Sequence, residues 1–398
     1  MAFTKSFIQF RHLQVLYLFS LLCALQSECL AESFYLQGQI KNAKQDYSII
    51  ISYPLQDSVA CIERQVDTLL LHNGRFYLSG DVEGLRPAII EINRHRYRFY
   101  LEPGTLTLEI DGNRPLQVQE TGTSVDDELA LLNHYTIEND SMLFYWHQKA
   151  LDWVYITEYD FDDVAEYDKW CQKRKDLLLE FCNAHVGFKI VPDLLCQVLE
   201  IDKAGSLEKK PFEKIKTIKS LSKRIPEEVI SSPMGRILQN SLRIAECAAK
   251  AQRHPVGALM PNISFTMIDG QCQRISDYRD SKYVLLHVWS DYCYNCELEI
   301  IAIENFRHRF TKNLEIISIS RLEQSKDEWT KSLERCQIDW VQTMDTWYTE
   351  LYQIYSPQIV SLLPCRLLPC FILIDMDGKI VDFEEGNLKY EGLFSDHW

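Results

Sequence analysis

The sequence predicts an α/β domain at the C-terminal end of the chain, preceded by a small antiparallel β-sandwich and a helical region. Short segments rich in β-branched and aromatic residues, separated by turn residues, fill residues 32–115. Apolar residues recur at helical spacing through residues 123–253, and β and α patterns then alternate through residues 256–398. A chain of 398 residues is long enough for several such units.

Residues 1–31 have the pattern of a secretory signal peptide. Lys5 and Arg11 precede an apolar core from Leu13 to Leu25, and the small-residue site Cys29-Leu30-Ala31 closes the segment. This core is too short to span a bilayer comfortably, so we expect export to the periplasm without a stable membrane span. Retention as an anchor and lipidation at Cys23 or Cys29 are the alternatives.

The charge of the chain argues against nucleic acid as a partner. Asp and Glu number 57 against 42 Lys and Arg, which gives a net charge of −15. Binding to phosphates needs clustered basic side chains, and the sequence has no basic stripe with interleaved aromatic residues.

The chain contains 13 cysteines, of which 11 remain if Cys23 and Cys29 are removed with the signal peptide. An odd number cannot all pair, so at least one thiol stays free or reactive in an oxidising compartment. The cysteines outside the motif described below are scattered, and we expect most of them to be small buried residues. They are Cys61, Cys171, Cys182, Cys196, Cys247, Cys272, Cys336, Cys365 and Cys370.

The β-rich segment is expected to contain several short strands. The turn sequences His72-Asn73-Gly74 and Glu102-Pro103-Gly104 separate some of them. The segment has no cluster of chemically active residues, which favours a docking or spacing role. The predicted strands are Ser33–Ile40, Tyr47–Tyr53, Thr68–Leu71, Arg75–Leu78 and Arg98–Leu101.

The helical region is expected to begin near Ser124, which precedes three acidic residues at positions 126–128. Pro211, Pro226 and Pro233 divide it into several helices, the last from Gly235 to Ala251. The proline-rich segment His254–Pro261 marks the next boundary.

The C-terminal segment is expected to form a sheet covered by helices. Predicted strands are Ile263–Ile268, Tyr283–Trp289, Leu314–Ile319 and Phe371–Ile374, followed by a hairpin turn at 375–378. Predicted helices run from Cys293 to about Phe310, from Lys326 to Cys336, and around Trp347–Tyr355.

A Cys-x-x-Cys motif follows the apolar strand that ends at Trp289. Cys293 would open a helix, where unpaired backbone N–H groups and the helix dipole favour its thiolate. Cys293 would then attack a substrate disulfide, and Cys296 would resolve the mixed disulfide. Half of a zinc site, or two inert structural thiols, are the alternatives.

Several segments in order resemble the TlpA/ResA-like branch of the thioredoxin family. The motif Trp-x-x-x-Cys-x-x-Cys-x-x-Glu runs from Trp289 to Glu299. The other matching segments are Pro261–Gly270, Leu314–Ser320, Trp329 and Leu368–Lys379. The resemblance implies a thioredoxin-like domain over 256–398. Residues 32–115 resemble a β-domain of unknown function that commonly precedes such domains in exported proteins of Gram-negative bacteria.

The resemblance assigns further residues to the site. Pro369, rather than Pro364, has the spacing to Asp375 expected of the family's cis-proline, and its neighbour Leu368 would present its backbone to an extended substrate. We expect Leu368, Pro369 and Trp289 to form the substrate-binding surface. Cys370 departs from the family, which usually has Thr there; a buried thiol, or a disulfide with Cys293 or Cys365, are the possibilities.

Two ionisable residues are candidates for proton transfer. Glu299 stands where the family holds a glutamate near the thiols, with a solvent-facing helix residue as the alternative. His287 lies two residues before Trp289, where thioredoxins carry a buried acid below the resolving cysteine; it would take the proton of Cys296, with a satisfied core histidine as the alternative.

The expected function is thiol-disulfide exchange with envelope proteins, without cofactor or metal. No Lys or Arg lies between Tyr283 and Glu304, which favours a reductant or isomerase, supplied by an upstream membrane electron donor as the resemblance implies. A peroxidase is disfavoured because no proline precedes Cys293 in the approach His287–Tyr292. The other alternative is a non-catalytic binding module with a vestigial thioredoxin fold.

Overall fold

The computed structural model describes most of the chain after residue 31. The described residues are 32–42, 48–54, 64–92, 95–111, 118–153, 161–203, 212–267, 271–289, 296–310, 313–321, 329–331, 333–334, 340–345, 362–365, 367–386 and 393–394. Within these, the side chains of 64, 95–96, 144, 147–153, 161–164, 200–203, 266, 296–298 and 321 are not described. The predicted signal peptide and the helix predicted around Trp347–Tyr355 lie outside this part of the chain.

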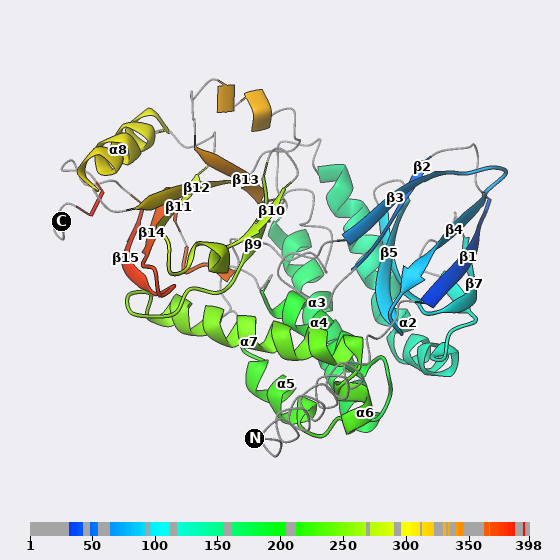
Figure 1. Ribbon diagram of the computed structural model, residues 1–398. Helices are drawn as coiled ribbons and strands as arrows, with labels where there is room; N and C mark the ends of the chain where they lie inside the picture. Colours follow the sequence, from blue (N-terminus) through cyan, green and yellow to red (C-terminus); the bar gives the residue numbers. More distant parts are fainter. Residues whose placement is uncertain are drawn as a thin grey trace, which may run out of the picture.

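The N-terminal region is a sandwich of two four-stranded sheets (Figure 1), ordered β4-β1-β7-β8 and β3-β2-β5-β6. The predicted antiparallel sandwich is confirmed, with one parallel pair among its described strands, β1 and β7. Three strands were not predicted, namely β5, β7 and β8. The strands are β1 (Glu32–Lys41), β2 (Ser48–Pro54), β3 (Arg64–Leu70), β4 (Arg75–Val82), β5 (Arg86–Ile92), β6 (His95–Leu101), β7 (Gly104–Asp111) and β8 (Val118–Thr121).

Alternation of side chains along β1 places one face in the core between the sheets. Phe34 and Leu36 are buried, whereas Tyr35 between them is exposed. Gly38 is required by packing, because a Cβ atom there would lie 1.9 Å from the ring of Phe76 on the neighbouring strand. Because glycine has no side chain, the ring of Phe76 can pack across β1 at Gly38 within the core.

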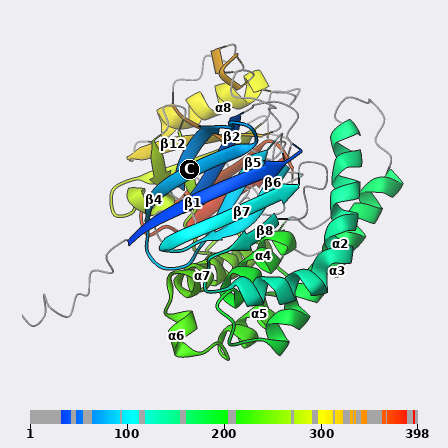
Figure 2. The same ribbon diagram turned by 90° about the vertical axis from the view of Figure 1, so that its right-hand side faces the viewer.

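Helices follow the sandwich from residue 126 to residue 253, and Figure 2 shows the long helices α2 and α3 side by side. The last helix, α7, begins at Pro233, two residues before the predicted start. Ser232 caps it by accepting a hydrogen bond from the N–H of Gly235 at 3.2 Å, and Pro233 occupies the first turn. The helices are α2 (Asp126–Trp153), α3 (Phe161–Ala184), α4 (Val191–Lys203), α5 (Ile215–Ser222), α6 (Glu227–Ile230) and α7 (Pro233–Arg253).

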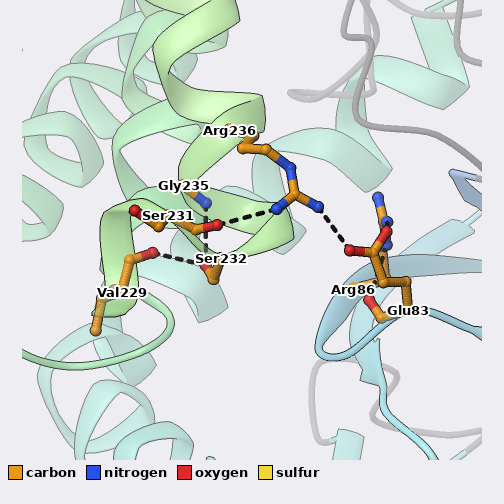
Figure 3. A network of polar contacts seen from close by, with 7 residues as sticks. All are labelled: Glu83, Arg86, Val229, Ser231, Ser232, Gly235 and Arg236. Carbon is orange, nitrogen blue, oxygen red and sulfur yellow. Dashed lines mark hydrogen bonds and ion pairs between the residues drawn. The ribbon is translucent and has the colours of Figure 1, made fainter. Parts of the chain in front are cut away.

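Polar contacts attach the sandwich to the start of α7 (Figure 3). Arg236 donates to the carboxylate of Glu83 at 2.7 Å and to the carbonyl oxygen of Ser231 at 3.0 Å. Arg86 donates to the other carboxylate oxygen of Glu83 at 3.0 Å. One carboxylate between β4 and β5 thus joins two arginines from different regions of the chain.

A second, more buried polar cluster joins β6 to α4. Asp193 of α4 is 3% exposed and forms an ion pair with Arg98 of β6. The hydroxyl of Tyr100 and the amide of Gln197 also donate to Asp193, at 2.7 and 2.9 Å. A buried carboxylate with this many donors holds the sandwich and the helices in one arrangement.

The C-terminal region is built on a five-stranded sheet of order β13-β12-β11-β14-β15. β11, β12 and β13 are parallel to one another, and β14 and β15 continue the sheet in antiparallel pairs. The remaining elements are β9 (Ser264–Thr266), β10 (Cys272–Arg274), a 3₁₀ turn at Ile275–Tyr278, β11 (Tyr283–Trp289), α8 (Cys296–Arg309), β12 (Leu314–Arg321), β13 (Val341–Asp345), β14 (Cys370–Ile374) and β15 (Ile380–Glu385).

Strand β11 is buried on both faces, as its continuous apolar sequence predicts. Leu285 packs in one cluster with Ile303 and Phe306 of α8. Leu286 and its even-numbered neighbours pack in another cluster, which includes Ala248 of α7. Figure 1 shows α8 and α7 on opposite sides of this sheet.

The segment between α7 and the sheet is itself paired to the hairpin of β14 and β15. Gly257 donates its N–H to the carbonyl oxygen of Ile380 at 2.7 Å, and Met260 donates to that of Gly378 at 2.8 Å. The predicted boundary segment is therefore a hydrogen-bonded connection. Among the described helices, none has a stretch long and apolar enough to cross a membrane.

Candidate functional site

The predicted dithiol lies between β11 and α8. β11 ends at Trp289 and the described helix begins at Cys296, which confirms the strand-to-helix order on both sides of the motif. Cys293 and the residues around it, 290–295, lie outside the described residues, as does the side chain of Cys296. The surroundings of the motif are described.

His287 and Glu299 meet beneath the start of α8. Nε2 of His287 lies 3.0 Å from Oε2 of Glu299, and each side chain is 1% exposed. Glu299 stands three residues after Cys296, which places it one helical turn along α8. The alternative prediction, that Glu299 faces solvent, is thus wrong. His287 and Glu299, which were predicted separately, form one buried pair.

Two further residues extend this pair into a chain of hydrogen bonds. Nδ1 of His287 lies 3.0 Å from Oγ of Ser318 on β12, and the indole N–H of Trp340 donates to the same Oγ at 2.7 Å. Because that Oγ accepts from Trp340, its own hydrogen can point to Nδ1 of His287. With this orientation of the hydroxyl, Nε2 of His287 carries the hydrogen and donates it to Glu299.

Aromatic rings enclose the imidazole. The ring of Phe371, on the neighbouring strand β14, stacks on that of His287 with centroids 4.9 Å apart and planes 6° apart. The ring of Trp289, which lies on β11 with His287, also stacks on the imidazole, with centroids 6.2 Å apart. These neighbours separate the pair from water, and a hydrogen bond is electrostatically stronger in such surroundings. His287 is thus hydrogen-bonded within the core, as the alternative interpretation also predicted.

Trp289 does not provide an open surface for substrate. Its side chain is 1% exposed and packs with Trp329 and Leu333. The expectation that it contacts substrate is therefore disfavoured, because the ring fills the interior between β11 and the helical segment that contains Trp329. Trp289 of the predicted motif and Trp329, from a separate segment of the resemblance, form a small core with Leu333.

The loop before β14 contains the other predicted substrate-binding residues. The peptide bond between Leu368 and Pro369 is cis, as predicted for Pro369 and not for Pro364. Within the described part of the chain, the backbone N–H and C=O of Leu368 form no hydrogen bond with another backbone group. Leu367, beside it, is 60% exposed. An open backbone edge next to an exposed apolar side chain suits an extended peptide.

The cysteines depart from the expectation of buried thiols in three cases. Cys365 and Cys370 are joined by a disulfide, with Cα atoms 6.0 Å apart, and Cys272 is also disulfide-bonded. The preferred interpretation of Cys370 as a thiol is wrong, since its partner is Cys365. Cys171, Cys182 and Cys196 are buried thiols as predicted, Cys247 is a half-buried thiol, and Cys61 and Cys336 lie outside the described residues.

The sequence did not identify Ser318, Trp340 or Phe371 as parts of the site. Ser318 carries a weak signal, because it is a polar residue within the otherwise apolar strand Leu314–Ser320. Trp340 and Phe371 resemble ordinary core residues in sequence. Their contacts with the pair depend on strand order and register, in which His287 lies opposite Ser318 on one side and Phe371 on the other.

Two of the three regions of the chain match known protein families. Residues 256–383 match the AhpC/TSA family, and residues 34–129 match a domain of unknown function, DUF4369. No curated protein matches the chain.

Solved structures resemble about a third of the chain. The thioredoxin domain of a thiol-disulfide oxidoreductase from Bacteroides vulgatus is 22% identical, with a TM-score of 0.26, over 33% of this chain and 89% of that chain. A thiol:disulfide interchange protein from Bacteroides sp. is 23% identical, with a TM-score of 0.26, over 32% and 80%. A thiol-disulfide oxidoreductase from Bacteroides fragilis is 21% identical, with a TM-score of 0.27, over 35% and 96%.

Proposed function

We propose that this chain, whose residues 256–383 form a thioredoxin-fold domain of the AhpC/TSA family, is a thiol-disulfide oxidoreductase acting through Cys293 and Cys296. The buried hydrogen bond between His287 and Glu299 carries the proposal. A buried acid–base pair is seldom the most stable filling of a sheet interior, so its position one turn from Cys296 favours a chemical role.

The reaction consists of two exchange steps. The thiolate of Cys293 attacks one sulfur of a substrate disulfide, forming a mixed disulfide and releasing one substrate thiolate. Cys296 then attacks the sulfur of Cys293, which releases the second substrate thiolate and leaves a Cys293–Cys296 disulfide. Two electrons pass from the dithiol to the substrate, and each released thiolate takes up a proton.

The pair of His287 and Glu299 supports the second step by accepting the proton that Cys296 loses as it attacks. Glu299 is the nearer acceptor along the helix, and the hydrogen bond from His287 fixes its carboxylate. Ser318 and Trp340 hold the imidazole from the other side. His287 is thus a positioning residue for Glu299.

We infer the direction of exchange from charge. With no Lys or Arg between Tyr283 and Glu304, the helix terminus is the favourable charge that this segment offers to the thiolate of Cys293. A thiol whose pKa is only weakly lowered belongs to a reducing couple, because an oxidant stabilises its reduced form. The chain therefore acts as a reductant or isomerase towards disulfides of envelope proteins, and a membrane electron donor regenerates the dithiol.

Reduction of insulin by dithiothreitol tests the proposal. The chain is expected to accelerate it, and Cys293→Ser is expected to abolish the acceleration. Cys296→Ser that is first reduced and freed of dithiothreitol should accumulate a mixed disulfide with insulin, visible on a non-reducing gel. Cys247→Ser, at a half-buried thiol outside the motif, is the matched control and should retain activity. No acceleration by the wild-type chain, together with a cellular phenotype that Cys293→Ser leaves intact, would instead support the non-catalytic binding module. Full activity of Cys293→Ser in the insulin assay would contradict the assignment of Cys293 as the nucleophile, and consumption of peroxide in a parallel assay would support a peroxidase.

Export is the second part of the proposal, and it rests on the charged, apolar and small-residue order of residues 1–31. N-terminal sequencing of the protein recovered from a periplasmic fraction is expected to begin at Glu32. An unprocessed chain in the membrane fraction would support retention as an anchor, and an acylated Cys23 or Cys29 would support lipidation.

A further inference from the structure

We propose that the Cys365–Cys370 disulfide is a second redox site, one that exchanges with thiols and controls the loop that presents Leu367 and Leu368. The inference rests on the proposed function, because this loop is the expected substrate-binding edge. The disulfide spans the loop, from Cys365 before it to Cys370 at the first position of β14.

The disulfide is not needed to hold the ends of the loop. Gln252 of α7 donates to the carbonyl oxygen of Leu363 at 3.2 Å, just before the loop. Gly386 donates to that of Pro369 at 2.8 Å, and β14 pairs with both β11 and β15 immediately after it. The ring closed by the disulfide is also short, with a sequence separation of 5, and short rings constrain the unfolded chain least. A purely stabilising role is therefore weakly supported.

The two sulfurs differ in accessibility, which sets the direction of attack. Cys370 is 0% exposed and packs in the cluster that includes Val288, whereas Cys365 is half-buried at the edge of the same cluster. An incoming thiolate is therefore expected to attack the sulfur of Cys365. Cys370 leaves, takes up a proton and remains in the interior as a small apolar thiol.

The exchange is complete with two equivalents of thiol. With glutathione, the first thiolate forms a mixed disulfide with Cys365 and frees the thiol of Cys370. A second glutathione thiolate then attacks the glutathione sulfur of that mixed disulfide, frees Cys365 and forms glutathione disulfide. Two electrons enter the protein, and both cysteines end as thiols.

Opening the disulfide affects the substrate edge directly. Leu367 and Leu368 lie within the ring, and the N–H of Leu367 donates to the carboxylate of Glu385 at 3.2 Å. When the disulfide is closed, the edge is held in one arrangement and is preorganised for a peptide. When it is open, the same edge must be ordered by the substrate, so binding is expected to weaken while the exchange chemistry is unchanged.

The first test uses the full chain with Cys293→Ser and Cys296→Ser, so that its result does not depend on the proposed function. The protein is equilibrated in glutathione buffers, thiols are trapped by alkylation, and peptides are mapped by mass spectrometry. We expect Cys365 and Cys370 to become alkylated together as the buffer becomes more reducing, while circular dichroism shows that the protein stays folded. A disulfide that persists in every buffer until the protein unfolds overturns the proposal.

The second test measures the consequence in a chain that keeps Cys293 and Cys296. The variant Cys365→Ala/Cys370→Ala is expected to raise KM for a disulfide-containing peptide by at least about threefold with kcat unchanged, the pattern of lost ground-state binding. Cys247→Ser is the control and should leave both constants unchanged. An unchanged KM would overturn the proposal that the disulfide controls the loop. If neither the wild type nor the variant turns over the peptide, the proposed function fails instead.

Discussion

The hydrogen bond between His287 and Glu299 predicts a large energetic coupling between two residues that are 12 positions apart in sequence. Replacing His287 with Leu removes its bond to the carboxylate and its bond to Ser318. A hydrogen bond to a charged group contributes about 1.5–3 kcal/mol and a neutral one about 0.5–1.5 kcal/mol, so we expect a loss of about 2–4 kcal/mol in the free energy of unfolding.

The assay is a double-mutant cycle in urea, followed by circular dichroism. His287→Leu and Glu299→Leu are each expected to destabilise, and the double variant should be more stable than the sum of the two by about 1–3 kcal/mol, because neither partner is then left in the core without the other. His287→Gln, whose amide can still donate to Glu299, is the matched control and should lose less. Strictly additive losses would refute the buried pair.

A related variant separates structure from chemistry at the same position. Glu299→Gln keeps an oxygen that accepts from His287 but removes the carboxylate that takes the proton of Cys296. Stability is expected to change by less than about 1 kcal/mol, while the resolving step of exchange slows by at least about tenfold. Unchanged resolution of the mixed disulfide in stopped-flow experiments would show that Glu299 is only structural.

Three further predictions concern the scaffold. Gly235→Ala should destabilise by about 1–3 kcal/mol in urea, because its Cβ atom would lie 2.1 Å from the carbonyl oxygen of Ile230, whereas Gly187→Ala, with 3.8 Å to its nearest neighbour, should be tolerated. Burial raises the pKa of Glu120 to about 8, so the folded state binds the proton of this carboxyl more tightly than the unfolded state does. The free energy of unfolding should therefore fall by about 3 kcal/mol as pH rises from 5 to 8. Glu120→Gln should flatten this pH dependence in thermal melts. Asp193→Ala should cost about 3–5 kcal/mol, because it removes a buried carboxylate that pairs with the part-buried Arg98 and accepts from the buried hydroxyl of Tyr100; a loss under 1 kcal/mol would contradict the described cluster.

Sequence patterns predicted the elements whose periodicity is strong. The apolar segments Tyr283–Trp289 and Phe371–Ile374 form central strands of the sheet, as predicted. The residues with helical spacing after Cys296 form α8. Strand β5 was missed because Arg86 and Pro87 open it with a charge and an imino acid, although Arg86 is itself buried. Local patterns thus fail where tertiary contacts accommodate an unfavourable residue.

The site was predicted as separate residues and not as an arrangement. Glu299 and His287 each had a sequence signal, but their contact depends on how α8 lies over β11, which no local pattern specifies. The disulfide between Cys365 and Cys370 was one of several open possibilities, because two cysteines five residues apart pair only if the loop between them folds back. The burial of Trp289 depends likewise on a distant segment that contains Trp329.

The most direct test of the dithiol mechanism is the reduction potential of the purified protein, measured in glutathione buffers with trapped thiols mapped by mass spectrometry. We expect a reversible Cys293–Cys296 disulfide with a potential on the order of −250 mV, in the range of reductants. A potential near about −120 mV would make the protein an oxidant and contradict the charge argument. If Cys293 and Cys296 form no disulfide in any buffer, the proposed exchange mechanism is wrong.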